Sequence, residues 1–380
     1  MQSIARRTIV ALTLVVSLGC PSAVAKTHWL QGPTRGDRIE VRVGIDVGRK
    51  HEEREGSLFP AMLAHLHTAF GDVQTAWTSA FEEGCSIHIG VGIQASAWTL
   101  SCESSTSARR FAKVFVQKLF AVGQVNRLAP QARVAQFVGA ANQANTIDIV
   151  LSGSNPVTAT ENEALDAIGL LVDDDVFDAW DGLVKKANIT VTVVGLRLQH
   201  IGKRPSGGRL GQPAQCAAEE DQVSFMSKRN SFLFVSAVPP RMMWPNVSVA
   251  KRVLHRRLHH RARARGLSYA PSVELVPAEC GVFLAMYVPV NRLLSAQSQA
   301  VSVIVSLGSD ITDDEIKAAL KAEAFAKDSK QDRTTAEMVE ASQRSQLKRG
   351  GTPTVKGVRE TLAKLLRQRQ FELRFEVPLK

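Results

Sequence analysis

The sequence predicts a mixed α/β (α+β) protein of two similar sandwich domains, in each of which helices cover one β-sheet. Segments with the two-residue alternation of strands and segments with the 3.6-residue period of helices follow one another along the chain. Their order over 38–201 returns over 222–380, and the stretch at 202–221 between them is rich in Gly, Pro and cations. With 380 residues, 44% of them hydrophobic, the chain has enough apolar material for two cores. We therefore expect a duplicated unit joined by a linker.

The first domain opens on a strand, because hydrophobic residues alternate with polar ones from Ile39 to Val47. Apolar residues then recur at helical spacing from Leu58 to Phe70. A hairpin with its turn near Gln94 follows, and then a helix over 107–120. The remaining elements predicted for this domain are a helix within 129–144, a strand at 147–151, a helix over 173–184 that begins with three aspartates, and a closing strand over 189–193.

The second domain repeats this order. Its strand at 232–238 is followed by an amphipathic basic helix that runs from Val249 and stops at Gly266. Two strands, at 272–276 and 281–288, are expected on either side of Pro277. The other elements predicted are a helix over 291–307, a helix begun by the capping box Thr312-x-x-Glu315, a polar mobile helix or loop over 327–350, a helix over 358–366, and a last strand over 371–377.

Residues 1–25 have the features of an export signal. Arg6 and Arg7 precede an apolar run that ends at Leu18, too short to span a bilayer comfortably. Two processing sites compete: cleavage after Ala25, or a lipobox that leaves Cys20 as a lipidated first residue. Both alternatives stay open. The expected location is the periplasm or the outer envelope, with a membrane contact through the anchor if Cys20 carries lipid.

The cysteines fit an oxidising compartment. Besides Cys20 there are four, Cys85, Cys102, Cys216 and Cys280, which allow three pairings. Cys85 and Cys102 flank two strands about a common turn, so antiparallel pairing would place them opposite each other and leave Cys216 with Cys280. The alternative is that all four are small buried hydrophobic residues.

The formal net charge of +11 favours acidic peptides, anionic headgroups or nucleic acid as partners. With two tyrosines and no phosphate-binding loop, the sequence argues against nucleic acid. The basic run over 251–265 fits a solubilising face, the lining of a peptide chamber, or a membrane-facing surface. His255 and His259 have the spacing of a metal-binding pair, but the arginines around them oppose a bound cation, so no metal or cofactor is expected.

The phrase Arg-Gly-Leu-Ser-Tyr over 265–269, at the end of the basic helix and before a hairpin, resembles the second half of the pitrilysin or insulinase-like metallopeptidases. The resemblance extends over 38–380 and is clearest at 251–290 and in the helix from Thr312. It implies a pair of similar domains that close around an unfolded peptide.

The resemblance does not imply catalysis. Active members carry H-x-x-E-H on the helix after the first strand, where two histidines hold zinc and the glutamate activates water. If Gly56-Ser57-Leu58 starts that helix, the three positions fall on Phe59, Met62 and Leu63, none of which can bind zinc or accept a proton. The third ligand is expected within 129–144, a segment that contains no acidic residue.

Active two-domain members also hold the substrate carbonyl with an arginine seven residues before a tyrosine. Tyr269 matches the tyrosine, but the arginine position is Ala262, with Arg261 and Arg263 on either side. Two interpretations follow: Tyr269 contacts peptide with Arg263 or Arg261, or Tyr269 is a packing residue and the arginines are a solvated face.

The resemblance thus implies a catalytically inactive homologue that is exported and serves as the peptide-binding subunit beside a catalytic, zinc-bearing insulinase-like chain. The alternatives are a stand-alone binding or scaffold protein of the envelope, and a residual metallopeptidase.

Overall fold

The computed structural model describes residues 26–34, 37–92, 94–125, 171–202, 222–226, 230–278, 281–328, 336–348, 350–368 and 370–376. The export segment, Cys20, the helix and strand predicted within 129–151, almost all of the linker, Cys216 and Cys280 lie outside these ranges. No helix of the described ranges is both long and apolar enough to cross a bilayer.

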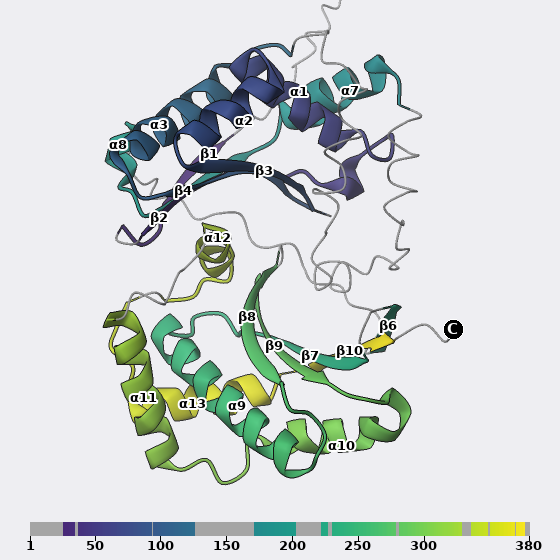
Figure 1. Cartoon of the computed structure of the whole chain (residues 1–380), viewed down its shortest axis with the longest axis vertical. Coiled ribbons are helices and arrows are strands. Elements are labelled where there is room, and N and C mark those ends of the chain that lie inside the picture. Colours follow the sequence, from purple (N-terminus) through teal and green to yellow (C-terminus); the bar gives the residue numbers. More distant parts are fainter. Residues whose placement is uncertain are drawn as a thin grey trace, which may run out of the picture.

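Two five-stranded sheets form the two domains (Figure 1). The first has the order β1 (Thr27–Gln31), β5 (Ile189–Val194), β2 (Arg38–Ile45), β4 (Ser96–Glu103) and β3 (Cys85–Val91). The second has the order β6 (Gln222–Met226), β10 (Gln370–Glu376), β7 (Ser231–Ala237), β9 (Gly281–Pro289) and β8 (Ser272–Ala278). In each sheet the first pair is parallel and the other three are antiparallel, so strand order and direction repeat in full. The predicted duplication and fold class are confirmed.

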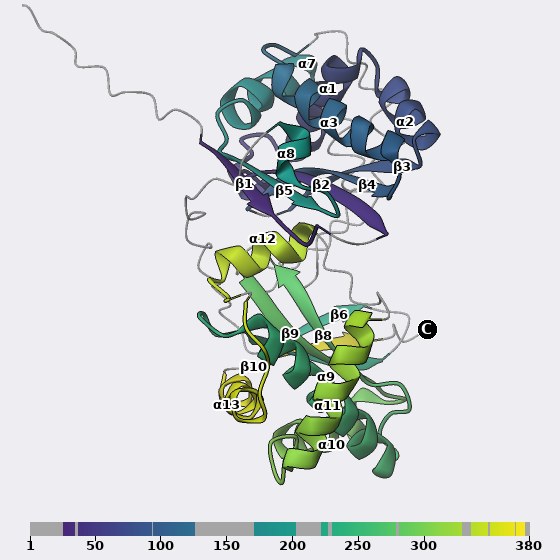
Figure 2. The same ribbon diagram turned by 90° about the vertical axis from the view of Figure 1, so that its left-hand side faces the viewer.

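Helices cover one face of the first sheet (Figure 2). They are α1 (Leu58–Phe70), α2 (Val73–Glu82), α3 (Thr106–Ala121), α7 (Asp173–Ala179) with a π-helical turn after it (Trp180–Val184), and the short α8 (Leu198–Ile201); a 3-10 turn, η1 (Arg49–His51), precedes α1. Side-chain caps start two of them: Asp72 accepts from the Thr75 N–H, and Ser105 accepts from the Ala108 N–H. The sequence analysis does not predict β1, because apolar and polar residues do not alternate along its five residues, THWLQ.

The second sheet is covered by α9 (Trp244–Ala264), α10 (Leu293–Ser306), α11 (Asp313–Asp328) and α13 (Val355–Leu366). The predicted capping box is present: the Glu315 N–H donates to the Thr312 hydroxyl, and the Thr312 N–H donates to the Glu315 carboxylate. One boundary differs from the prediction. Pro277 lies inside β8 and does not end it, because β8 is an outer strand, where a missing N–H costs no ladder hydrogen bond.

The polar segment predicted as mobile contains a docked helix, α12 (Ala336–Arg344), which lies between the two sheets (Figure 2). It contacts β2 and β5 of the first sheet and β8 and β9 of the second. Ala336 and Val339 are buried, and together with Val194 they form a small apolar cluster. The helix agrees with the prediction of a helix or loop, but its docked position was not predicted, because the polar residues of α12 find partners on another domain, which local sequence does not reveal.

An ion cluster fixes α12 to the first sheet. Glu340 is buried, accepting from Arg42 of β2 at 3.2 Å and from Arg344 of its own helix at 2.7 Å. The Glu40 carboxylate accepts from the Ala336 N–H at 2.6 Å, at the start of the helix. Arg42 and Glu40 both belong to the face of β2 that the helices of the first domain leave uncovered, so this cluster joins the two domains.

The partly buried His65 of α1 contacts three other elements of the first core. The His65 ring on α1 lies 4.9 Å from the Trp98 ring of β4. Its Nδ1 accepts from the Trp180 indole at 3.1 Å, and its Nε2 donates to the Leu119 carbonyl at 2.9 Å. Burial lowers the pKa of His65 to about 4, although the Leu119 hydrogen bond opposes that shift. His65 is therefore neutral, with its proton on Nε2.

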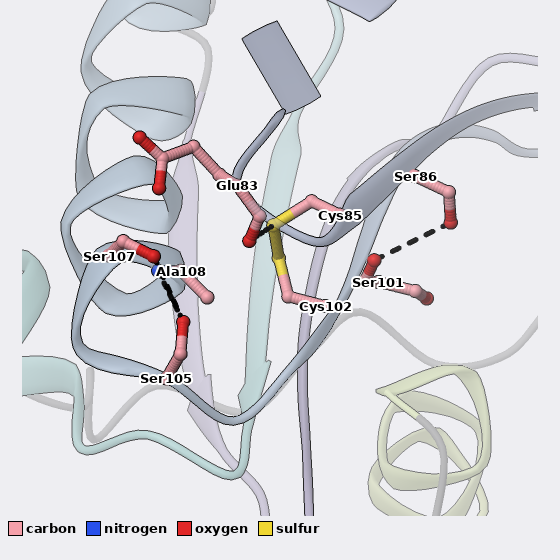
Figure 3. Close-up of a disulfide and its surroundings, with 8 residues drawn as sticks. All are labelled: Glu83, Cys85, Ser86, Ser101, Cys102, Ser105, Ser107 and Ala108. Carbon is pink, nitrogen blue, oxygen red and sulfur yellow. Dashed lines mark hydrogen bonds between the residues drawn. A yellow bond between two sulfur atoms is a disulfide. The ribbon is translucent and has the colours of Figure 1, made fainter. Parts of the chain in front are cut away.

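The hairpin of β3 and β4 is closed by a disulfide (Figure 3). Cys85 and Cys102 face each other in the strand register and are bonded, and both are buried. Beside them the Ser86 hydroxyl donates to the Ser101 carbonyl, and the Ser105 cap starts α3. Because the bond joins neighbouring strands of one sheet, it holds β3, the outer strand, in place.

Glu340→Gln should destabilise the protein by about 1–3 kcal/mol, because two largely buried guanidinium groups would lose their shared carboxylate. Glu337→Gln, an exposed position one turn earlier on α12, is the matched control and should change the free energy of unfolding by less than about 0.5 kcal/mol. Urea denaturation measures both. Equal losses in the two variants would contradict the role of the cluster.

Stability should fall as pH drops from about 6.5 to 4, through His65. The unfolded chain takes up a proton near the ordinary pKa of 6.5, whereas folded His65 stays neutral until about pH 4. The contribution is complete above pH 6.5, and at most about 3 kcal/mol is lost by pH 4. Urea denaturation of the wild type and His65→Gln across this range should show a shallower pH dependence for the variant. An NMR titration giving His65 a pKa near 6.5 would contradict this expectation.

Candidate functional site

The resemblance predicts the zinc-motif positions on α1, and the residues predicted to occupy them lie in the core. Phe59, Met62 and Leu63 are all buried in the cluster between α1 and the first sheet. The Met62 carbonyl accepts a hydrogen bond from the Trp98 indole at 3.1 Å. His65, the nearest imidazole on the helix, uses both ring nitrogens in the core. Phe59, Met62 and Leu63 offer apolar contact, and none of them is an imidazole, thiolate or carboxylate of the kind that binds zinc.

The loop before α1 holds a second, partly buried ionisable group. The Glu52 carboxylate accepts from the N–H groups of Gly56 and Leu58, at 3.0 and 2.8 Å, and so caps the start of α1. Burial raises the pKa of Glu52, and the two backbone hydrogen bonds oppose the rise. Its oxygens are thus occupied in holding the helix, which leaves Glu52 a structural role.

In the second domain, Tyr269 and Arg263 lie together, but Arg261 lies apart from them. Arg263 donates from Nε and a terminal nitrogen to the Tyr269 carbonyl, at 3.2 and 3.1 Å, and the Tyr269 side chain is 74% exposed. Arg261 donates instead to the Ser306 carbonyl and to Ser309 at the end of α10. Ala262, between the two arginines, is buried. The exposed ring of Tyr269 is therefore available for contact, and Arg263 orients its loop.

Among the described residues, the outer edge of strand β3 has no partner strand. The Glu103 N–H donates to the Gly84 carbonyl and the Gly92 N–H donates to the Ala95 carbonyl, so the pairs 84/103 and 92/95 are hydrogen-bonded pairs of the β3–β4 ladder. Because such pairs alternate along an antiparallel ladder, the N–H and C=O groups of Ile87 and Ile89 point away from β4. No strand of the described ranges pairs with that side of β3. The strand also carries no Pro or Lys to discourage pairing.

The corresponding strand of the second domain, β8, is closed. The Val273 N–H donates to His255 Nδ1 at 3.1 Å, and Pro277 has no N–H to offer. Glu274, between them, pairs with Lys251 of α9 at 3.5 Å. Within the described ranges, the two equivalent outer strands thus differ: β3 has no partner on its outer side, and β8 is protected against one.

An exposed aromatic residue stands beside the open strand. Phe81, near the end of α2, is 82% exposed and lies four residues before β3 begins. His88 lies on the face of β3 that the helices of the first domain leave uncovered, and it is exposed. The pKa of His88 is lowered, mainly by partial burial and to a smaller extent by the positive charge of Arg42. Sequence reasoning missed this site, since a strand's place at the edge of a sheet has no signal in its own residues.

The basic helix α9 lines a shallow hollow of about 350 Å³ against α11. His255 lines this hollow and stacks on His259 with ring centroids 6.5 Å apart, and the pKa of His255 is lowered, mainly by burial. Most cations of this helix are engaged: Arg252 pairs with Glu323, and Arg257 pairs with Glu315 at 2.6 Å. Within the described ranges, no three His, Cys, Asp or Glu side chains converge as metal ligands would.

Comparison with known proteins gives the fold. No protein-family model and no curated protein matches the sequence. Among solved structures, the inactive domain of an M16 peptidase from Pseudomonas fluorescens is 15% identical with a TM-score of 0.57, and the match covers 94% of this chain and 96% of that one.

Two larger proteins match over about half of their length. Pitrilysin is 14% identical with a TM-score of 0.55, covering 92% of this chain and 43% of that one. The periplasmic protease PqqL from Escherichia coli is 11% identical with a TM-score of 0.56, and the match covers 92% of this chain and 46% of that one. The resemblance read from the sequence is confirmed at the level of structure: this chain has the two-domain fold of the M16, or pitrilysin-like, peptidases.

Proposed function

We propose that this chain is a non-catalytic, peptide-binding subunit that pairs with a separate zinc-bearing chain of the same fold. The observation that carries the proposal is the burial in the first core of Phe59, Met62 and Leu63, the residues that the resemblance assigns to the three motif positions. Replacing ligands with core residues removes the hydrolytic centre and stabilises the helix that held it. What survives is a surface suited to binding a polypeptide.

The binding element in this proposal is β3. An extended peptide would pair with the outward N–H and C=O groups of Ile87 and Ile89, which gives affinity independent of peptide sequence. Phe81 would supply an apolar contact at one end of that strand. From the second domain, the exposed ring of Tyr269 is a further candidate contact, with Arg263 holding its loop in place.

Two comparisons support a partner. Pitrilysin and PqqL contain within one chain about twice the length that this chain matches. The Pseudomonas fluorescens neighbour, described as an inactive domain, matches this chain over nearly its full length. A half that lacks zinc ligands would then act beside a half that has them.

Export belongs to the proposal as well. The export segment at 1–25 and the bond between Cys85 and Cys102 both fit an oxidising compartment. Intact-mass analysis of the mature protein distinguishes the two alternative processing products, which begin at Lys26 or at a lipidated Cys20.

The purified chain should not cleave reduced, carboxymethylated lactalbumin, with or without added zinc. Mixed with the H-x-x-E-H chain of the same fold from its own genome, it should form a one-to-one complex that cleaves this substrate and is inhibited by a chelator. Sedimentation velocity and a gel-based cleavage assay measure the two outcomes. Chelator-sensitive cleavage by the chain alone would contradict the proposal.

Amide hydrogen exchange tests β3 directly. In the free protein the N–H groups of Ile87 and Ile89 should exchange faster than those of Ser86 and His88, which bond to β4. Added carboxymethylated lactalbumin should slow the two isoleucine amides and leave Ser86 and His88 unchanged, as followed by NMR. If the polypeptide binds while the isoleucine amides keep their exchange rates, β3 is not the binding element.

A further inference from the structure

Helix α3 has an outer side that carries positive charge and no negative charge. The helix contains no Asp or Glu at any position. Beyond its first turn, exposed residues recur every three or four positions and so form one ridge along the helix. These residues, with one exposed neighbour, are called here the α3 face: Arg109, Arg110, Lys113, Gln117 and Phe120.

The three cations of the α3 face are unpaired. Within the part of the chain that the structure describes, no carboxylate forms an ion pair with Arg109, Arg110 or Lys113. The neighbouring elements β1 and α8 contain no Asp or Glu either. Two arginines soon after the first turn gain nothing from the helix dipole, which favours acidic residues near that end. The positive charges are therefore available to an external anion.

Two aromatic rings lie at the C-terminal end of the α3 face. The rings of Trp29 on β1 and Phe120 stack with their centroids 5.8 Å apart, and Phe120 is 41% exposed. Both residues line a hollow of about 450 Å³ between β1, α3 and α8, and Lys113 lines it with them. The hollow thus brings a cation and two aromatic rings together at the surface.

This combination is typical of a surface that lies on an anionic membrane. Lys and Arg attract the headgroups, and Trp and Phe rings enter the boundary between headgroups and acyl chains. A solubilising helix face ordinarily mixes both signs of charge. Helix α13 is such a face, because Glu360 is exposed among its cations and its Arg359 pairs with Asp313.

The position of the α3 face suits contact with a flat surface. Figure 1 shows α3 and α8 on the side of the first sheet that faces away from the second domain. Strand β1, which lines the hollow, begins at Thr27, seven residues after Cys20. Seven extended residues reach at most about 25 Å. A lipid on Cys20, one of the two processing alternatives, would therefore hold the α3 face close to the membrane.

Other occupants match this surface less well. A second copy of this chain would bring no carboxylate to the cations, since α3, β1 and α8 contain none. A soluble acidic protein would neutralise the cations, but it accounts neither for the ring pair beside them nor for the start of β1 at this place.

We propose that the α3 face, together with Trp29, is the surface by which this chain lies on a bilayer of anionic phospholipids. The cations bind headgroup phosphates, and the rings of Trp29 and Phe120 enter the boundary with the acyl chains. This contact needs neither the partner chain nor a bound polypeptide, so it goes beyond the proposed function. It serves either processing product.

Vesicle sedimentation tests the contact with the chain that begins at Lys26, which carries no lipid. This chain should bind vesicles of phosphatidylglycerol and phosphatidylcholine in equal parts, and should not bind vesicles of phosphatidylcholine alone. Arg109→Gln combined with Lys113→Gln should weaken binding to the mixed vesicles by about tenfold or more, because each cation near an anionic surface strengthens binding by about fivefold.

A matched double variant is the control. Lys364→Gln combined with Arg367→Gln also removes one exposed lysine and one exposed arginine, but from α13 of the second domain. It should change the affinity for the mixed vesicles by less than about twofold, because charges away from the membrane are screened by salt. Thermal unfolding followed by circular dichroism verifies that the variants fold.

Phe120→Ser tests the contribution of the rings. The variant should bind the mixed vesicles about threefold or more weakly than the wild type, because it loses apolar contact with the bilayer. Its remaining binding should fall more steeply with salt, since only the attraction between charges is left.

Several outcomes would contradict the proposed surface. If the wild-type chain does not bind the mixed vesicles, or if the double variants of α3 and α13 bind them equally well, the α3 face does not bind membranes. Binding of soluble polyglutamate at this face without binding of vesicles would assign it to an acidic protein. Self-association that the α3 double variant abolishes would assign it to a second copy. The proposed function is tested separately, by cleavage with the zinc-bearing chain.

Discussion

The structure depends on how α1 packs against the first sheet. In that contact Phe59, Met62 and Leu63, which the resemblance assigns to the zinc-motif positions, supply buried apolar surface. Zinc ligands must instead keep their electron pairs directed at a cavity, which costs core packing and leaves polar atoms to be satisfied. In this chain the helix is part of the core. His65, with both nitrogens bonded internally, belongs to the same packing.

Duplication produced two sheets of the same order, and small sequence differences then gave their equivalent edges different properties. The outer strand β8 is protected by a proline, a histidine that takes one amide, and a lysine–glutamate pair. The outer strand β3 has none of these, and a disulfide holds it against β4. An open edge is an aggregation hazard unless it has a use, so its retention beside an exposed phenylalanine favours a binding role.

The two domains are held by α12, which contributes to both. Its attachment to the first sheet is ionic, through Glu340 and the two arginines around it, whereas its apolar residues are few. An ionic and largely buried contact fixes one orientation more strictly than an apolar one, because a shifted helix would leave charges unpaired. The relative placement of the open strand and the second domain follows from this one helix.

Local patterns were enough to predict most of the described elements and their duplication, because hydrophobic period and residue chemistry are properties of short segments. Three patterns can each be recognised from a short segment: the alternation that begins at Ile39, the helical spacing from Leu58 to Phe70, and the capping box at Thr312. The shared turn between Cys85 and Cys102 likewise indicated that the two face each other.

Other features emerge only in the folded chain. They are the identity of the edge strands, the docking of α12 between the sheets, and the pairing of Tyr269 with Arg263 rather than Arg261. The first two depend on contacts between residues far apart in the chain, such as Arg42 with Glu340, and the third depends on where α10 lies against α9. No pattern confined to one segment carries that information, because each partner is fixed by the packing of a different element.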